Sequence, residues 1–123
     1  MTLTSTPFGR TGRNTSRIGF GAWAIGGTWG EVSLADAKAS LHAALDAGVT
    51  FIDTADVYGD GRSERIIAEV LAERPGSRPF VATKAGRRLN PHVADAYTGA
   101  AIEAFIARSL QNLRVERPDL LHL

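Results

Sequence analysis

The chain has 123 residues, of which 44% are hydrophobic and 22% are charged, and its formal net charge at pH 7 is +1. This composition is that of an ordinary globular protein, and the scattered basic residues do not favour a nucleic-acid partner. The absence of cysteine excludes disulfides and thiolate metal sites, and no apolar run is long enough for a secretory signal or a membrane span. We therefore expect a cytoplasmic protein without a membrane partner.

The first part of the chain is predicted to form a hairpin, a strand and a helix. Glycine and polar residues cluster in the middle of 8–18, which is typical of a short hairpin. A strand is expected over about 18–24, and the glycine-rich loop 26–30 follows it. The helix begins near Ser33, which heads a pattern similar to a capping box, and Gly48 ends it.

Strands and helices continue to alternate in the rest of the chain. The predicted elements are a strand over about 50–54, a helix from about Ser63 to the Pro75-Gly76 pair, a strand over 80–84, a helix over about 98–113 and a strand after Pro118. This order favours parallel strands joined by right-handed crossovers.

The predicted fold class is α/β, and a resemblance of the chain to a known family implies the (β/α)8 TIM-barrel type within this class. A closed barrel of this type needs about 250 residues, so the chain supplies only a hairpin and about four βα units. We expect residues 1–123 to be the N-terminal part of a single barrel domain. The two open strand edges of such a half barrel favour self-association of the isolated chain.

Two of the predicted strands end in charged residues, and a tyrosine follows one of them. Asp53 ends the strand over 50–54, Lys84 ends the strand over 80–84, and Tyr58 lies in the loop after Asp53. The ends of neighbouring parallel strands lie about 4.8 Å apart, so these side chains are expected to converge on one face. The Lys84 ammonium would stabilise negative charge on the phenolic oxygen, and the Asp53 carboxylate would orient the lysine.

These residues belong to longer segments that resemble the aldo-keto reductase family. The segments are Asp53-Thr54-Ala55 with Tyr58-Gly59 and Ser63-Glu64, then Val81-Ala82-Thr83-Lys84, and upstream Gly19-Phe20-Gly21-Ala22-Trp23. The resemblance runs from about Phe8 to the last residue. It implies an oxidoreductase that reduces aldehydes or ketones to alcohols with NADPH, in which Tyr58 donates the proton and Lys84 and Asp53 tune it.

The resemblance also implies where the cofactor and the carbonyl substrate would bind. The backbone at Gly21, Ala22 and Trp23, together with Asp53, would approach NADPH (NADP+ after the reaction). Trp23 and Tyr58 would line the pocket for a small-molecule carbonyl substrate. The family places most of its cofactor contacts in the C-terminal half of the barrel.

The family's catalytic set includes a histidine at the end of the fourth strand. It closes a pattern such as Asp-Leu-Leu-x-Leu-His, and Asp119-Leu120-Leu121-His122-Leu123 matches that pattern up to the position before the histidine. The histidine would be the next residue, so these 123 residues are expected to be inactive alone. His122 would lie two residues below the catalytic level, roughly 6.6 Å deeper in the barrel by strand rise.

Side-chain alternation along the strands adds a prediction about the two faces of the sheet. If Asp53 and Lys84 point into the barrel, Phe51, Phe80 and Ala82 share that face, whereas Ile52, Val81 and Thr83 face the helices. Outside the strands, Trp29 is assigned to loop packing, and Arg87 and Arg88 to a solvated pair.

Other interpretations remain open from the sequence. Gly19-x-Gly21-x-x-Ala24 imitates a dinucleotide-binding fingerprint, but a second glycine loop separates it from the next helix. His42 and His92 have no metal-ligand partner at useful spacing, so no metal is expected. The aldo-keto reductase fold also serves as a non-catalytic binding or regulatory subunit. A third alternative is an unrelated parallel α/β enzyme or a phosphate-binding barrel.

Overall fold

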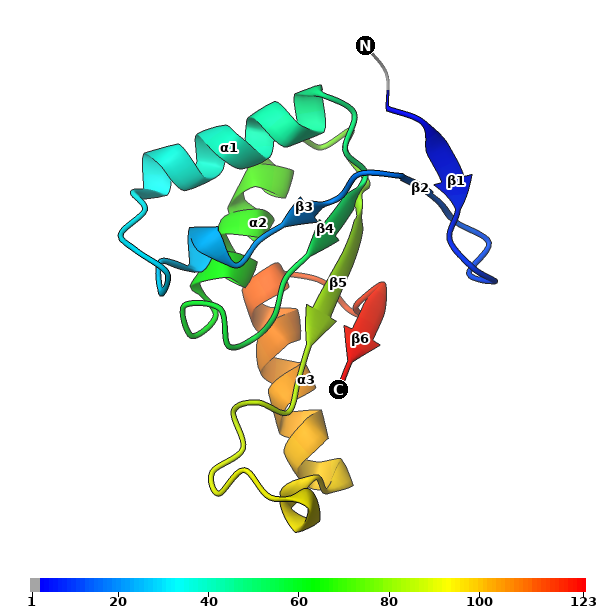
Figure 1. The fold of residues 1–123 in the computed structure, drawn as a ribbon. Coiled ribbons are helices and arrows are strands. Elements are labelled where there is room, and N and C mark those ends of the chain that lie inside the picture. The colour runs from blue at the N-terminus through cyan, green and yellow to red at the C-terminus, as the bar shows by residue number, and fades with distance from the viewer. Residues whose placement is uncertain (1–2) are drawn as a thin grey trace.

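The computed structural model describes residues 3–123. In chain order its elements are β1 Ser5–Pro7, β2 Asn14–Ser16, β3 Phe20–Gly21, the 3-10 turn η1 Ala24–Gly26, α1 Leu34–Asp46, β4 Phe51–Asp53, α2 Arg62–Ala72, β5 Phe80–Lys84, the 3-10 turn η2 Ala94–Ala96, α3 Gly99–Leu113 and β6 Leu120–His122. Strands β3 to β6 form one parallel sheet in sequence order, and the three helices lie together on one side of it (Figure 1). The predicted hairpin followed by parallel βα units is confirmed.

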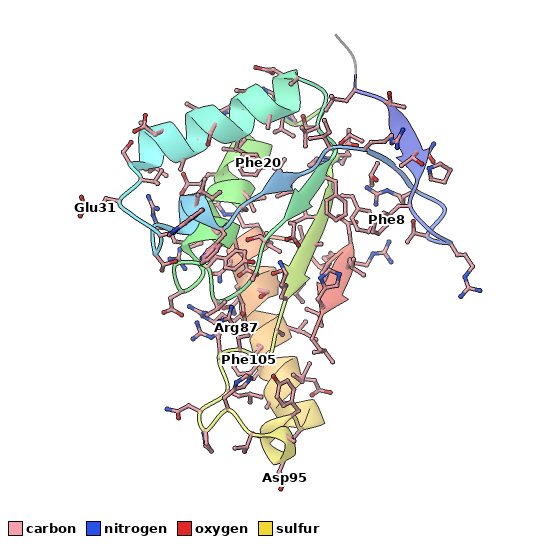
Figure 2. All side chains as sticks on the ribbon, in the orientation of Figure 1. Phe8, Phe20, Glu31, Arg87, Asp95 and Phe105 are labelled. Atoms are coloured by element: carbon pink, nitrogen blue, oxygen red, sulfur yellow. The ribbon has the colours of Figure 1, made fainter. Side chains whose placement is uncertain are left out.

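The hairpin lies at the end of the sheet where β4 and β5 begin (Figure 1). Its strands β1 and β2 are antiparallel, and the Phe8 ring lies 5.3 Å from the Phe51 ring and 5.0 Å from the Phe80 ring. Figure 2 shows Phe8 between the hairpin and the sheet. The prediction placed the whole hairpin within 8–18, which was wrong, because that segment holds only the turn and the second strand.

The helix ends follow their capping residues. Ser33 caps α1 by accepting a hydrogen bond from the Asp36 N–H at 3.0 Å, and Thr98 caps α3 by accepting one from the Ala101 N–H at 3.2 Å. Gly48 follows α1 with φ +92°, and Arg114 ends α3 in the left-handed region with φ +57°. These boundaries match the predicted ones to within two residues.

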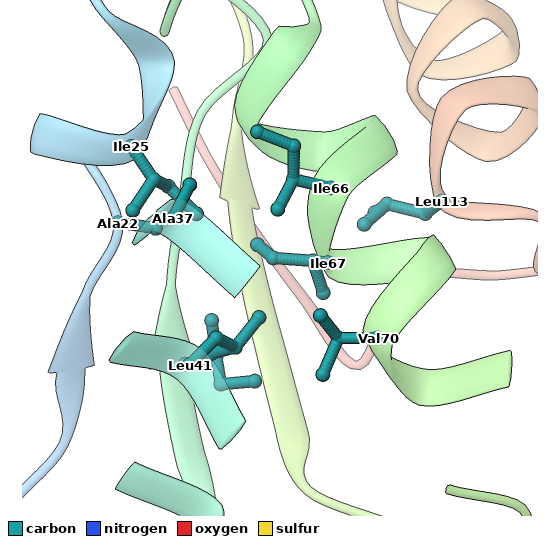
Figure 3. Close-up of a cluster of buried hydrophobic side chains, with 9 residues drawn as sticks. Ala22, Ile25, Ala37, Leu41, Ile66, Ile67, Val70 and Leu113 are labelled. Carbon is teal, nitrogen blue, oxygen red and sulfur yellow. The ribbon is translucent and has the colours of Figure 1, made fainter. Parts of the chain in front are cut away.

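The core lies between the sheet and the helices. Figure 3 shows side chains of α1, α2 and α3 meeting there, with Leu113 of α3 pointing toward Ile66 and Val70 of α2. Ile52 of β4 is fully buried in this cluster, and Val81 of β5 packs against it, as the alternation predicted. The opposite face of the sheet carries the stacked rings of the two strand phenylalanines, whose centroids are 5.6 Å apart.

The first strand of the sheet is much shorter than its predicted span of 18–24. Only Phe20 and Gly21 pair with β4, and the chain then turns into η1, whose N-terminal flank is Trp23. Between the fingerprint-like glycines and α1 the chain forms η1 and a glycine loop, as the second glycine loop in the sequence led us to expect. None of the helices in residues 3–123 is long and apolar enough to cross a membrane.

Candidate active site

The Lys84 ammonium joins the ends of β4 and β5. Its Nζ donates hydrogen bonds to Oδ1 and Oδ2 of Asp53 at 2.8 and 2.9 Å and to the backbone oxygen of Thr54 at 2.9 Å. The same Nζ lies 3.3 Å from the phenolic oxygen of Tyr58 and 5.1 Å from the centre of its ring. The three residues expected to converge therefore do so around one ammonium group.

This cluster is open to solvent on the inner face of the sheet, which is the face opposite the helices. The Lys84 and Asp53 side chains are 30% and 40% exposed, so the ion pair between them is only partly shielded from water. The ion pair lies next to the Tyr58 hydroxyl, which suits this hydroxyl to donating its proton to a bound polar group. The adjacent ammonium would stabilise the negative charge left on the phenolic oxygen.

Buried hydroxyl groups fix the loop that carries Tyr58. The Ser63 hydroxyl contacts the Thr54 hydroxyl at 2.9 Å and donates to the Ala22 backbone oxygen at 3.0 Å. The Asp56 N–H donates to the Lys84 backbone oxygen at 3.2 Å, so the loop is also tied to the end of β5. These contacts connect β3, β4, β5 and the start of α2 behind the tyrosine.

Two glycines allow the Tyr58 loop to touch the loop after β3. A Cβ atom at Gly59, where φ is +62°, would lie 2.1 Å from the Gly26 backbone oxygen. A Cβ atom at Gly26 would lie 2.8 Å from the Tyr58 backbone carbon and 2.9 Å from the Gly59 nitrogen. Only hydrogen fits at either position, so this backbone contact helps to set where the phenol lies.

Trp23 stands beside the phenol and stacks on a second tryptophan. Its ring centre is 6.3 Å from that of Tyr58 and 5.1 Å from that of Trp29, with an interplanar angle of 14° to the latter. Trp23 is 51% exposed and Trp29 is 72% exposed. Trp29, assigned to loop packing, packs on the Trp23 ring, and its remaining surface is exposed.

The two residues before Trp23 differ in how a ligand could contact them. The Ala22 N–H donates to the Asp53 backbone oxygen at 2.9 Å and its oxygen accepts from Ser63, so its polar backbone groups are both bonded within the protein. At Gly21, a Cβ atom would meet no atom within 4 Å. The open surface therefore lies at Gly21 and along the Trp23 ring.

A network of charged residues that was not predicted from the sequence lies behind the Tyr58 loop. Glu64 is fully buried and accepts hydrogen bonds from the Thr83 hydroxyl at 2.7 Å and from the Asn112 amide at 3.0 Å. Asp56 is 1% exposed, and its Oδ2 has no hydrogen-bond partner among residues 3–123. The sequence carried one signal of this network, since Glu64 lies three residues before Ile67 on the apolar face of α2.

Burial raises the pKa of the Asp56 carboxyl, and the negative charge of Glu64 raises it further. The positive charges of Arg88 and Arg108 and a backbone hydrogen bond from Val57 oppose this rise in pKa. Both arginines pair with Asp60 on the exposed side of the network, Arg108 at 3.0 Å. The prediction that Arg88 belongs to a solvated pair with Arg87 was therefore wrong.

His122 does not lie where the sequence count placed it. The register of the sheet pairs His122 with Lys84, instead of placing it two residues lower, because the stagger between strands cannot be read from one strand alone. Its side chain is exposed. Among residues 3–123 no three His, Cys, Asp or Glu side chains are grouped closely enough to hold a metal ion.

Comparison with known proteins, by sequence and by fold, points to one family. The model of the family described as "Aldo/keto reductase family" matches residues 17–123. D-threo-aldose 1-dehydrogenase of a Pseudomonas species is 36% identical over 127 residues, which cover 86% of this chain and 39% of that protein.

Solved structures of the family superimpose on nearly the whole chain. A glycerol dehydrogenase from Gluconobacter oxydans does so with a TM-score of 0.77 and 36% identity, over 95% of this chain and 38% of its own. An aldo-keto reductase from Klebsiella pneumoniae, solved in complex with NADPH, gives a TM-score of 0.73 and 26% identity, over 98% of this chain and 39% of its own. The chain thus spans about two fifths of the length of each of these proteins. From its parallel βα units and from these matches, we conclude that the chain belongs to the aldo/keto reductase family of oxidoreductases.

Proposed function

We propose that the chain is the N-terminal part of an aldo-keto reductase domain that reduces aldehydes or ketones to alcohols with NADPH. The observation that carries the proposal is the contact of one ammonium, that of Lys84, with both the Asp53 carboxylate and the Tyr58 hydroxyl. A scaffold without catalysis does not need this arrangement. A carbonyl reductase does, because negative charge develops on the carbonyl oxygen as the bond is reduced.

Each of the three residues has a role in the proposed reaction. Tyr58 donates its phenolic proton to the carbonyl oxygen, and the Lys84 ammonium stabilises the phenolate that remains. Asp53 holds the ammonium in place through both carboxylate oxygens, at 2.8 and 2.9 Å. Bound NADPH supplies the hydride.

The proposed cofactor and substrate surfaces lie next to this cluster. The open surface at Gly21 fits the approach of the nicotinamide end of the cofactor, with the Trp23 ring and Asp53 beside it. Ala22 contributes its buried position and not a free hydrogen-bonding group. The exposed face of Trp23 and the Tyr58 hydroxyl form the proposed site for the carbonyl substrate.

We further propose that a polypeptide of these 123 residues has negligible turnover by itself. It holds three members of the proposed catalytic set, and the family histidine is not among its residues. Assay of this polypeptide with NADPH and a reactive aromatic aldehyde tests the proposal. Turnover that disappears in Tyr58→Phe would contradict the proposed inactivity while supporting the chemistry.

A chimaera separates the chemistry from the question of completeness. Residues 17–123 would replace the corresponding part of the Gluconobacter oxydans glycerol dehydrogenase, whose fold 95% of the chain matches with a TM-score of 0.77. We expect the chimaera to reduce an aldehyde with NADPH, and Tyr58→Phe to lower kcat by about 10²-fold or more, as loss of a general acid does.

The matched control for Tyr58→Phe is Tyr97→Phe, because Tyr97 lies in the loop after β5 and its hydroxyl contacts His92 at 2.7 Å. This control is expected to retain the activity of the chimaera. A folded chimaera that binds NADPH, measured by quenching of its fluorescence, but has no turnover would favour the alternative of a non-catalytic subunit. Equal activity of both tyrosine variants would refute the role of Tyr58.

A further inference from the structure

A second hollow lies at the opposite end of the sheet from the candidate active site. It has a volume of about 410 Å³ and is bounded by α2, the end of α3 and the segments that lead into β5 and β6. Asp53 and Lys84 are the last residues of their strands, whereas Pro79 and Pro118 in the wall of this hollow precede theirs. The hollow is therefore separate from the site proposed for the carbonyl and the cofactor.

The floor of the hollow is apolar. Ala68 and Ala72 lie one helical turn apart on α2, so their small side chains leave space between this helix and the end of α3. Leu71, Val81 and Leu113 complete the floor. Figure 3 shows Leu113 reaching from α3 toward α2 beside this region. A volume of this size falls in the range of pockets that bind small molecules, roughly 300–1,000 Å³.

The rim of the hollow is strongly basic. Four arginines line it, Arg13, Arg78, Arg114 and Arg117, and Asp119 is the one carboxylate among its lining residues. We call it the arginine-rimmed hollow. In a chain whose formal net charge is only +1, this places an excess of three positive charges around one apolar surface.

The carboxylate in the wall is already used by the protein. Asp119 accepts a hydrogen bond from Arg13 at 3.0 Å through Oδ1 and one from the Val81 N–H at 2.9 Å through Oδ2. Within residues 3–123, none of the other three guanidinium groups has a carboxylate oxygen within 4.0 Å. Arg78, Arg114 and Arg117 are thus available to an anion from outside.

We propose that the arginine-rimmed hollow binds a small organic anion with an apolar body, such as an aromatic carboxylate. A guanidinium group pairs with a carboxylate through two parallel hydrogen bonds, which suits it better than an ammonium to this task. The apolar body of the ligand would cover the alanine and leucine floor and remove it from water. Charge complementarity favours this occupant over a second copy of the chain, which would bring its own arginines to the same surface.

The probe for this site is 1-naphthoate, with its neutral amide as the matched ligand. Titration of the chain by calorimetry is expected to show saturable binding of one naphthoate, at least tenfold weaker binding of the amide, and weakening of naphthoate binding as salt is raised. Lack of saturation up to about 5 mM, or equal affinity for the amide, would overturn the proposal.

Variants locate the bound anion. Arg114→Gln and Arg117→Gln are each expected to weaken binding at least fivefold, whereas Arg10→Gln, an exposed arginine of the hairpin turn outside the hollow, leaves it unchanged. Lys84→Met is also expected to leave naphthoate binding unchanged, because Lys84 lies in the candidate active site and not in the hollow. Only an anion bound at the candidate active site would depend on the Lys84 ammonium. Loss of binding in Lys84→Met with retention in the arginine variants would refute the proposal.

A filling variant keeps the test independent of the arginines. Ala72→Phe places a ring over the floor from an exposed position at the end of α2, so it is expected to abolish naphthoate binding while circular dichroism stays unchanged. Light scattering on the same samples examines the other occupant. A dimer that Ala72→Phe dissociates, with no naphthoate binding in the original chain, would show that a second copy covers the hollow and would overturn the proposal.

Discussion

At the level of single residues, Lys84 is expected to matter for the chemistry of the candidate site and little for the stability of the fold. Its ammonium makes four close contacts to Asp53, Thr54 and Tyr58, yet the side chain is 30% exposed. Partly exposed ion pairs contribute only about 0–1 kcal/mol to stability, because water screens them. The arrangement is therefore better explained by what it does to the phenol than by what it adds to folding.

The corresponding prediction concerns Lys84→Met. In the chimaera we expect kcat to fall by about 10²-fold or more, because the phenolate loses its stabilising charge, while the free energy of unfolding changes by about 1 kcal/mol or less. Steady-state kinetics and thermal melting of the same preparation check both values. A loss of stability large enough to account for the loss of activity would contradict the proposed role.

Asp56 gives a prediction about pH. Its folded-state pKa is raised, first by burial and then by the charge of Glu64, so the folded protein binds a proton more readily than the unfolded chain does. This carboxyl therefore favours the folded state at low pH, and its contribution is lost as pH rises from the unfolded-state pKa through the raised folded-state pKa. Asp56→Asn removes this dependence.

We accordingly expect the stability of Asp56→Asn, relative to the original chain, to increase as pH rises from 4 to 7, which denaturant titrations at several pH values would measure. Asp95→Asn is the control, because it makes the same chemical change at a carboxyl that is exposed in η2 (Figure 2). If the stability of Asp56→Asn relative to the original chain instead fell as pH rises, the carboxyl would not be penalised by burial.

At the level of elements, the contact between the two loops depends on glycine. Gly59→Ala would place a Cβ atom 2.1 Å from the Gly26 oxygen, at a φ of +62° that disfavours alanine. We expect a loss of about 2 kcal/mol or more in the free energy of unfolding, together with displacement of Tyr58. Chemical denaturation measures the first effect, and turnover of the chimaera measures the second.

The control is Gly99→Ala, at the first residue of α3. A Cβ atom there meets nothing within 4 Å, so alanine is expected to leave stability unchanged or to raise it by up to about 1 kcal/mol. If both alanine variants lost similar stability, the crossing of the two loops would not be the feature that requires glycine.

The end of α3 makes the opposite kind of prediction. Arg114 adopts φ +57°, a conformation that costs an ordinary residue about 1 kcal/mol and glycine almost nothing. Arg114→Gly is therefore expected to raise the free energy of unfolding by up to about 1 kcal/mol, as measured by denaturant titration. Glu116→Gly should instead lower the free energy of unfolding. The φ angle of Glu116 is not positive, so glycine relieves no strain there and only increases the conformational entropy of the unfolded chain.

The sequence predicted those features that local physics decides. The cap at Ser33 and the two faces of β4 and β5 follow from side-chain chemistry and alternation within a few residues. The hairpin position and the level of His122 were misplaced, because pairing between strands depends on turn geometry and stagger. The buried network around Asp56 was missed for a similar reason, since its partners come from α2, α3 and the loop after β5.

At the level of the whole molecule, the four-stranded sheet ends in β3 on one side and β6 on the other. Strand edges without a neighbour expose backbone hydrogen-bonding groups, and they promote pairing between chains. The inner face is also open, apart from the hairpin at one end (Figure 1). Residues 3–123 thus combine a well-packed helical side with a sheet face that is covered only at one end, by the hairpin.

We therefore expect this polypeptide to associate in a concentration-dependent manner, which sedimentation velocity would detect. Leu120→Lys, on the inner face of β6 beside Ala82, is expected to shift the distribution toward monomer, because a charge on an edge strand opposes pairing. Gln111→Lys adds the same charge at an exposed position of α3 and should leave the distribution unchanged. A monomer at all concentrations, with a cooperative unfolding transition, would show that the open edge and face do not cause association. Equal effects of the two lysine variants would show that net charge, and not β6, controls any association.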